Sequence, residues 1–279
     1  MSRDPQFSVK AVEVFPVGGL PEIVRGTDLG RLIAEQCAVN GTPIAGGDLV
    51  VVAQKVVSKA EGAVQRISAQ VPTEEALELA ERVGKDPRLV QIVLDHSSRV
   101  VRAVPGVLIV ETRHGFICAN AGIDQSNVEG DDLVTTLPDD PDLSARTIRD
   151  AIVKSGIGPD WPGLSEGSGP SDRPARPGLT IGVLVSDTFN RPWREGSINV
   201  AIGTAGFDPL RDLRGSADDF DREMTTSMVS LADEVASTAQ LVMGESGRVP
   251  VAIVRGVDWE PGDYPISRLL RPPGKDLFR

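Results

Sequence analysis

Two aspartates in this chain follow apolar runs and have no evident structural task, which makes them the first candidates for chemistry. Asp124 lies in the stretch ETRHGFICANAGIDQSNV, residues 111–128, after an apolar run at residues 107–110. Asp187 lies in the stretch VSDTFNRPWR, residues 185–194. A carboxylate held at the end of a strand is well placed to bind a hard cation.

The surroundings of Asp187 favour such a placement. The continuous apolar run of residues 179–185 predicts a buried strand, and we expect it to end on Ser186, Asp187 and Thr188. Mg²⁺ needs only one or two protein carboxylates when phosphates and water supply the other ligands. Aspartate is also a common turn and cap residue, so from spacing alone a structural role stays open.

The amino-acid sequences of three segments resemble those of a known family. HGFICANAGIDQSNV, SDTFNRPWR and VVSKAEG (residues 56–62) closely resemble signature segments of the coenzyme F420-0:L-glutamate ligase family, the gamma-glutamyl ligases that complete the deazaflavin coenzyme. Further matches occur in order along the chain. They are FPVGGLPEI (residues 15–23), GKDPRLVQIVL (residues 84–94), LPDDPDLSARTIR (residues 137–149) and RPPGKDLF (residues 271–278).

The resemblance implies a reaction, cofactors and an assembly. In the family, L-glutamate is joined through its amine to the terminal carboxylate of coenzyme F420-0, while GTP becomes GDP and phosphate. The implied cofactors are Mg²⁺ or Mn²⁺ at a first and a second site, with K⁺ as a further cation. The implied assembly is an intertwined homodimer.

The resemblance also assigns residues to the metal sites. Asp124 and Asp187 match the ligands of the first divalent cation, and Thr188 and Glu245 match those of the second. The family has a glutamine where this chain has Glu245. A carboxylate still coordinates Mg²⁺ well, so we expect the site to survive that change.

The implied GTP site draws on four parts of the chain. Lys59 matches a lysine that contacts GTP, and Gln54 stands where the family usually has a small hydroxyl residue, which puts a contact there in doubt. The remaining implied GTP contacts are Leu20, Pro21, Glu22, Ile23, Asn127, Met243, Gly244, Glu245, Ser246, Gly247, Arg248, Val249 and Pro250.

Composition narrows the class of protein. At 279 residues with a net charge of −11, the chain suits one large domain and argues against nucleic acid or an anionic membrane as its main partner. We find no membrane-spanning run and no signal-peptide apolar region, so we expect a cytoplasmic protein. The two cysteines, Cys37 and Cys118, have apolar neighbours and are predicted to be buried free thiols.

Common nucleotide and metal motifs are missing. The sequence contains neither a G-x-x-x-x-G-K-[ST] loop nor a G-x-G-x-x-G after a strand, so a P-loop or Rossmann site is not supported. Paired Cys/His elements for zinc are also missing. His114 lies inside the signature stretch and its role stays open, whereas His96 follows a predicted helix and suits a capping role.

Strands and helices alternate without a regular period, which predicts an α/β or α+β protein with a mixed sheet, and the resemblance adds two interleaved subdomains. We expect strands at residues 9–15, 48–57, 198–202 and 251–254, a turn at 208–211, and helices at 27–40, 73–83, 86–95, 140–154 and 219–243. The strand at residues 48–57 would deliver Lys59 to its end.

One segment looks like an insertion into a single domain of residues 1–279. Residues 157–178 are rich in Gly, Pro and Ser, so we expect a flexible loop without a catalytic role. Trp193 is predicted to be a packing residue, and the small residues Ala232, Ala236 and Ala239 would allow close packing, including between subunits.

Two other functions remain compatible with the aspartates. A metal-dependent nucleotide phosphohydrolase could use them without glutamate. In a non-catalytic oligomer, they would be turn and cap residues only.

Overall fold

The computed structural model describes residues 11–125, 132–158, 178–218 and 220–276. Its largest sheet has the strand order β1-β12-β2-β8-β9, built from β1 (Glu13–Pro16), β12 (Val251–Arg255), β2 (Leu49–Ala53), β8 (Gly182–Arg191) and β9 (Arg194–Ala205). β2 and β8 run parallel, and the other neighbours are antiparallel. This confirms the predicted mixed sheet.

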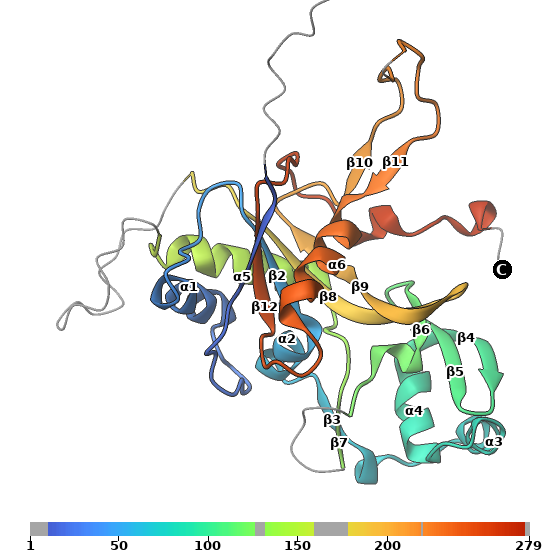
Figure 1. Ribbon diagram of the computed structural model, residues 1–279. Coiled ribbons are helices and arrows are strands. Elements are labelled where there is room, and N and C mark those ends of the chain that lie inside the picture. Colours follow the sequence, from blue (N-terminus) through green and yellow to red (C-terminus); the bar gives the residue numbers. More distant parts are fainter. Residues whose placement is uncertain (1–10, 126–131, 159–177, 219, 277–279) are drawn as a thin grey trace, which may run out of the picture.

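Helices cover both faces of this sheet. In Figure 1, α6 (Leu231–Met243) crosses in front of it, and α5 (Pro141–Lys154), which packs against α1 (Leu29–Val39), lies behind it. Ala232, Ala236 and Ala239 are fully buried against this core, so these small residues serve packing within the chain. The main core is continuous from β12 and β2 to α6.

A smaller unit is inserted between β2 and α5 and has its own apolar clusters. It contains the sheet β4-β5-β6 (Ser97–Val104, Val107–Thr112 and Ile117–Ala119), whose strand β4 contacts helices α3 (Glu74–Val83) and α4 (Pro87–Asp95). β3 (Val64–Arg66) pairs with β7 (Leu133–Thr135) where the chain enters and leaves it. The unit lies at the lower right of Figure 1. The interleaving of two subdomains and the intertwined homodimer stay predictions.

Several predicted helix starts are confirmed, because their caps are local. Thr73 accepts a hydrogen bond from the backbone N–H of Ala76 at the start of α3. Asp86 and Asp140 do the same for α4 and α5, and each is followed by a proline in the first turn. Asp28, not Thr27 as predicted, caps α1.

The strand predicted at residues 48–57 is wrong in its second half. β2 ends at Ala53, and the chain turns directly into helix α2 (Gln54–Glu61), which ends at Gly62 with a left-handed φ of 78°. Val57 and Ala60 are buried one helical turn apart, which fits a helix, whereas the apolar pair Val56 and Val57 by itself suits either element type. Lys59 therefore lies on a helix and not at a strand end.

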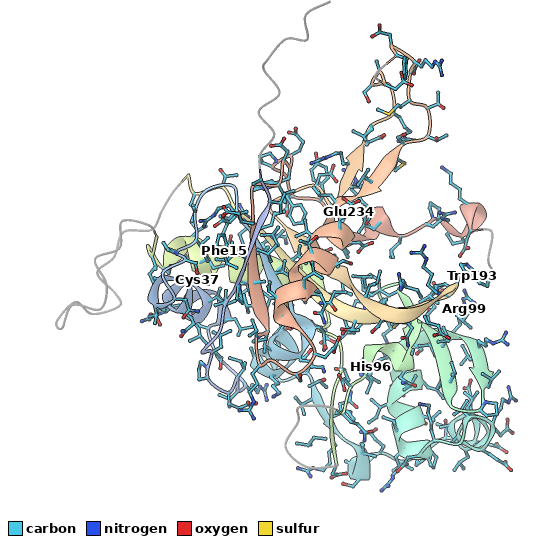
Figure 2. The ribbon with its side chains drawn as sticks, viewed as in Figure 1. Phe15, Cys37, His96, Arg99, Trp193 and Glu234 are labelled. Carbon is cyan, nitrogen blue, oxygen red and sulfur yellow. The ribbon has the colours of Figure 1, made fainter. Side chains whose placement is uncertain are left out.

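The prediction that the strand of residues 179–185 ends on Ser186, Asp187 and Thr188 is wrong. β8 continues to Arg191, and from Ser186 onward its main strand partner is β9. Burial alternates along this part, which is how a two-stranded ribbon tolerates polar residues. Trp193 lies at the tip of the ribbon and is 77% exposed, so the prediction that it is a packing residue is wrong (Figure 2).

The helix predicted at residues 219–243 forms only over α6. Met228–Ser230 forms β11, which pairs with β10 (Leu210–Asp212) in the region predicted to be a turn. This hairpin extends from the body of the molecule in Figure 1. Pairing between segments distant in sequence outweighed the local helical pattern.

Short elements complete the described chain. They are the 3-10 helices η1 (Ile67–Ala69), η2 (Asn120–Gly122), η4 (Ile266–Leu269) and η5 (Pro273–Lys275). Cys37 and Cys118 are free and buried, as predicted, and burial raises the pKa of each thiol to about 12. Among the described residues, every helix is too short or too polar to cross a membrane. The predicted insertion at residues 157–178 lies almost wholly outside the described residues.

Candidate functional site

A pocket of about 620 Å³ gathers most of the predicted site residues from distant parts of the chain. It lies where the loop after β1, the start of α2, the middle of the β8–β9 ribbon and the end of α6 meet. The predicted residues that line it are Leu20, Pro21, Glu22, Ile23, Gln54, Lys59, Asp187, Thr188, Met243, Gly244, Glu245, Ser246, Arg248, Val249 and Pro250.

Three predicted residues stand apart from this lining. Gly247 lies in the same loop but does not line the pocket. Asp124 does not line the pocket itself but contacts Lys55, which does. The Nζ atom of Lys55 lies 2.6 Å from Oδ2 of Asp124. Asn127 lies outside the described residues.

Asp124 is held at the edge of the smaller unit. It follows η2, and its backbone N–H and C=O are both hydrogen-bonded to Thr135 at 3.1 and 2.9 Å. This isolated bridge holds the backbone of Asp124, so the carboxylate projects from a rigid support.

Asp187 has the most perturbed carboxyl group of the pocket. Burial raises its pKa to about 7, and the neighbouring carboxylates of Asp124 and Glu245 add to the rise. A hydrogen bond from the backbone N–H of Thr188 and the charge of Lys55 act in the opposite direction. The three carboxyl groups predicted to bind metal thus interact electrostatically, although they come from three separate segments.

These groups fit a divalent cation that shares its ligands with phosphate. No three His, Cys, Asp or Glu side chains among the described residues are grouped closely enough to form a metal site alone. Two oxygen ligands from Asp124 and Asp187 would nevertheless suffice for Mg²⁺ when phosphate oxygens and water complete its coordination. A cation would also stabilise the ionised form of Asp187, which burial disfavours.

Basic residues also line the pocket. Lys59 on α2 lies with its Nζ 2.5 Å from Oε1 of Glu22, and the lysine is mostly buried while Glu22 is 77% exposed. The glutamate can therefore turn away into solvent if an anion competes for the ammonium group. Lys55 and Arg248 also line the pocket. The pocket thus offers both positive groups for phosphate and negative groups for a cation.

Gln54 has a buried acceptor without a partner. Its Nε2 donates to Ser58 Oγ at 2.5 Å and to the carbonyl of Thr136 at 2.8 Å, which fixes the orientation of the amide. Its Oε1 atom is buried and has no hydrogen-bond partner among the residues that the structure describes. Because Gln54 lines the pocket, a ligand N–H or O–H could satisfy this oxygen.

Lys55, Asn199 and Gln240 were not predicted from the sequence to belong to the site. All three line the pocket. Asn199 and Gln240 join Thr188 to Glu245 through consecutive hydrogen bonds. The spacing of Gln240 and Glu245 near a helix end was a weak signal, whereas the pairing of Asn199 with Thr188 depends on strand register.

Neither histidine lines this pocket. His96 ends α4, as its predicted capping role requires, and its Nε2 lies 2.8 Å from Nε2 of Gln65. Burial, followed by the charge of Arg113, lowers its pKa. His114 stacks on Phe116, and its Nε2 lies 3.0 Å from the carbonyl oxygen of Asp139.

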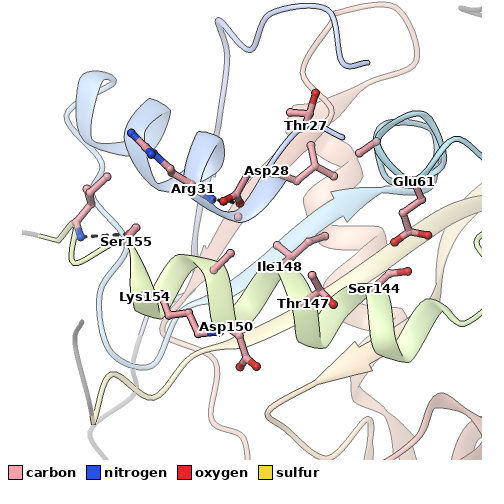
Figure 3. Close-up of a pocket in the computed structure, with 15 residues that line it drawn as sticks. Thr27, Asp28, Arg31, Glu61, Ser144, Thr147, Ile148, Asp150, Lys154 and Ser155 are labelled. Atoms are coloured by element: carbon pink, nitrogen blue, oxygen red, sulfur yellow. Dashed lines mark hydrogen bonds between the residues drawn. The ribbon is translucent and has the colours of Figure 1, made fainter. Parts of the chain in front are cut away.

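A second pocket of about 520 Å³ lies between α1, α5 and the end of α2 (Figure 3). Glu61, Asp150, Arg31 and Lys154 line it, so its charges are mixed. Burial raises the pKa of Glu61, while a hydrogen bond with Ser144 lowers it. None of the predicted site residues lines this second pocket, so the first pocket, which gathers most of them, is the candidate site.

The segments that meet at the first pocket lie within the part of the chain that resembles known proteins. The sequence model of the F420-0:gamma-glutamyl ligase family matches residues 19–157 and 174–256. The chain is 40% identical to a protein of Methanothermobacter thermautotrophicus named coenzyme F420:L-glutamate ligase, over 96% of this chain and 99% of that protein.

Two further relatives carry the same name. One, from Methanocaldococcus jannaschii, is 38% identical over 90% of each chain. The other, from Halorubrum lacusprofundi, is 41% identical over 91% of this chain and 90% of that protein. With most of its length matched by the family model and by relatives of this similarity, the chain belongs to the F420-0:gamma-glutamyl ligase family, a family of ligase enzymes.

Proposed function

We propose that this protein joins L-glutamate to coenzyme F420-0, and then further gamma-linked glutamates, using GTP. The observation that supports this most is the first pocket, which is lined by lysines from α2 together with carboxylates from β8 and from the loop after α6. A nucleotide that binds with a divalent cation needs both kinds of group. The names of the relatives supply the acceptor and the amino acid.

The proposed reaction has two steps because a carboxylate is a poor acyl donor. A carboxylate oxygen of F420-0 attacks the γ-phosphorus of GTP, GDP leaves, and an acyl phosphate forms. The amine nitrogen of L-glutamate then attacks the acyl carbon, phosphate leaves, and the nitrogen releases a proton. The product contains a new amide bond.

The protein's own groups would stabilise negative charge in the first step. Lys59 would turn from Glu22 to the phosphates, where its ammonium group contributes charge-assisted hydrogen bonds. Lys55, which pairs with Asp124, lies close enough to Asp187 to affect its pKa and adds a second positive charge. Asp124 and Asp187 would hold the first cation, and Thr188 and Glu245 the second.

Bound Mg²⁺ or Mn²⁺ would supply charge neutralisation at the phosphates. The predicted roles of K⁺ as a further cation and of Asn127 at the nucleotide remain part of this proposal. So do the homodimer and the cytoplasmic location.

The main rival is a metal-dependent nucleotide phosphohydrolase acting through the same carboxylates. The second is a non-catalytic oligomer. Purified protein should be incubated with GTP, Mg²⁺ and F420-0, with and without L-glutamate, and GDP and the glutamylated product measured together. GDP release that needs both F420-0 and glutamate supports the ligase. Release without them would support the hydrolase, and failure to bind GTP or GDP would support the oligomer.

A further inference from the structure

We propose that Asn199 and Gln240 are positioning residues that fix the direction of hydrogen bonding between Thr188 and Glu245. They would thereby keep the Thr188 hydroxyl oxygen available as an acceptor for a cation. The role of the cation rests on the proposed function, whereas the direction of the hydrogen bonds is independent of that function.

Four side chains from four segments form a continuous row. Thr188 Oγ1 on β8 lies 2.9 Å from Oδ1 of Asn199 on β9. Asn199 Nδ2 lies 2.9 Å from Oε1 of Gln240 on α6, and Gln240 Nε2 lies 2.9 Å from Oε1 of Glu245. Asn199 is only 4% exposed, whereas Thr188 and Glu245 at the two ends are exposed.

The carboxylate at one end determines the direction of every link. A carboxylate can only accept, so Gln240 must present its NH₂ group to Glu245 and its oxygen to Asn199. Asn199 must then present its NH₂ group to Gln240 and its oxygen to Thr188. The hydroxyl of Thr188 must donate its only proton to that oxygen.

This direction of hydrogen bonding determines which oxygen atoms of Thr188 and Glu245 can bind a cation in the pocket. Once the proton of Thr188 is committed to Asn199, the lone pairs of Oγ1 remain available to a cation. At the other end, Gln240 occupies Oε1 of Glu245, which leaves Oε2 available for the same purpose. The row therefore presents two oxygen ligands with set orientations.

The middle of the row cannot easily move. Thr188 and Asn199 are direct partners in the β8–β9 register, and the backbone oxygen of Asn199 accepts a hydrogen bond of 2.8 Å from Ser237 on α6. Asn199 Nδ2 also makes a longer contact of 3.4 Å with Ser186 Oγ. The buried amide thus links the ribbon to α6 at the point where the two ligands must be aligned.

Asn199→Asp tests the direction, because an aspartate has no NH₂ group to offer Gln240. Gln240 must then turn its NH₂ group to the new carboxylate and its oxygen to Glu245, where two acceptors meet. Adding Glu245→Gln restores a donor at that end, so N199D/E245Q can form every link in the new direction. N199D/E245A removes the same charge without restoring the donor.

The measurement is thermal unfolding of the full chain in chelator at pH 8. We expect N199D to melt several degrees below wild type, and N199D/E245Q to melt several degrees above N199D/E245A. Asn190→Asp, on the same ribbon but outside the row, controls for the added charge and should melt near wild type. Equal melting of N199D/E245Q and N199D/E245A would overturn the proposed direction.

Gln240→Leu tests positioning by breaking the row without changing charge. We expect the affinity for Mn²⁺, measured by calorimetry with the metal alone, to fall about tenfold or more. Thr238→Val, two residues away on α6, should leave it unchanged. Wild-type affinity in Q240L, or no Mn²⁺ binding by the wild type, would overturn the positioning role. Neither assay uses GTP or F420-0, so loss of the proposed ligase activity would be a separate result.

Discussion

The ammonium group of Lys55 lies 2.6 Å from the carboxylate of Asp124, although the two residues are far apart in the chain. Lys55 is in the first turn of α2 and 30% exposed, and Asp124 belongs to the smaller unit and is 34% exposed. The charge of Lys55 also lowers the pKa of Asp187. One lysine therefore offsets the repulsion between two carboxylates from different segments.

Lys55→Met should destabilise the protein in chelator at pH 8 by about 1 kcal/mol, because Asp124 and Asp187 then repel each other without a neighbouring cation. The loss should be smaller at pH 5, where Asp187 is protonated. Chemical denaturation at both pH values provides the measurement. Arg99→Met, which breaks the 2.7 Å pair with Glu111, is a matched control without this pH dependence. Equal losses at both pH values for K55M would contradict the explanation.

Asp124→Asn and Asp187→Asn should each lower metal-dependent turnover severely, by on the order of 100-fold or more. The double variant should be little worse than the worse single one, because residues that act as a unit are not additive. Glutamate-dependent GDP formation across a Mg²⁺ titration is the measurement. Wild-type turnover in both single variants at low Mg²⁺ would rule out a shared metal site.

Asp187→Asn should also change how stability depends on pH. Burial and the neighbouring carboxylates raise the Asp187 pKa from 3.8 to about 7, so the folded protein binds more protons than the unfolded chain between these values. The free energy of unfolding therefore falls as pH rises from about 4 to about 7. The asparagine variant lacks this loss, which is on the order of 4 kcal/mol.

Denaturation of wild type and D187N in chelator from pH 4 to pH 8 tests this prediction. The two curves should separate with rising pH, with D187N the more stable protein at pH 8. Asp150→Asn, at an exposed position on α5, should follow the wild type. Parallel curves for wild type and D187N would show that Asp187 titrates near its ordinary pKa.

Lys59→Ala should weaken GDP and GTP binding by about 10-fold to 100-fold and reduce stability by less than about 1 kcal/mol. We expect a larger effect on nucleotide affinity than on stability because Glu22, the partner of Lys59, is mostly exposed and the ion pair contributes little to folding. Glu22→Gln releases Lys59 from its ion pair and should leave nucleotide affinity unchanged or increase it. Calorimetry of both variants measures these effects, and unchanged affinity in K59A would remove Lys59 from the site.

Gln54→Leu should lower both stability and nucleotide affinity. Loss of the Gln54 Nε2 donor leaves Ser58 and the Thr136 carbonyl with fewer buried hydrogen bonds, which costs about 1 to 3 kcal/mol. Loss of the unpartnered Oε1 removes an acceptor from the pocket. Gln70→Leu, at a partly exposed position outside the pocket, is the control. If GDP affinity in Q54L stays at the wild-type value, Oε1 does not contact the nucleotide.

Local chemistry in the sequence determined the starts of α3, α4 and α5 and the identity of the site segments. Thr73, Asp86 and Asp140 cap their helices through hydrogen bonds within three residues, so the pattern is readable without a fold. Asp187 and Lys59 could be singled out by residue type and by resemblance. The mixed sheet also followed from the alternation of apolar runs.

Tertiary structure decided where these segments meet and what lies between them. The turn from β2 into α2 was ambiguous in the sequence because the apolar pair Val56 and Val57 suits either a strand or a helix. Lys55 pairs with Asp124 only because the smaller unit folds back onto α2, and Asn199 reaches Thr188 only in the observed β8–β9 register. Such contacts depend on long-range packing and register, which residue order does not encode locally.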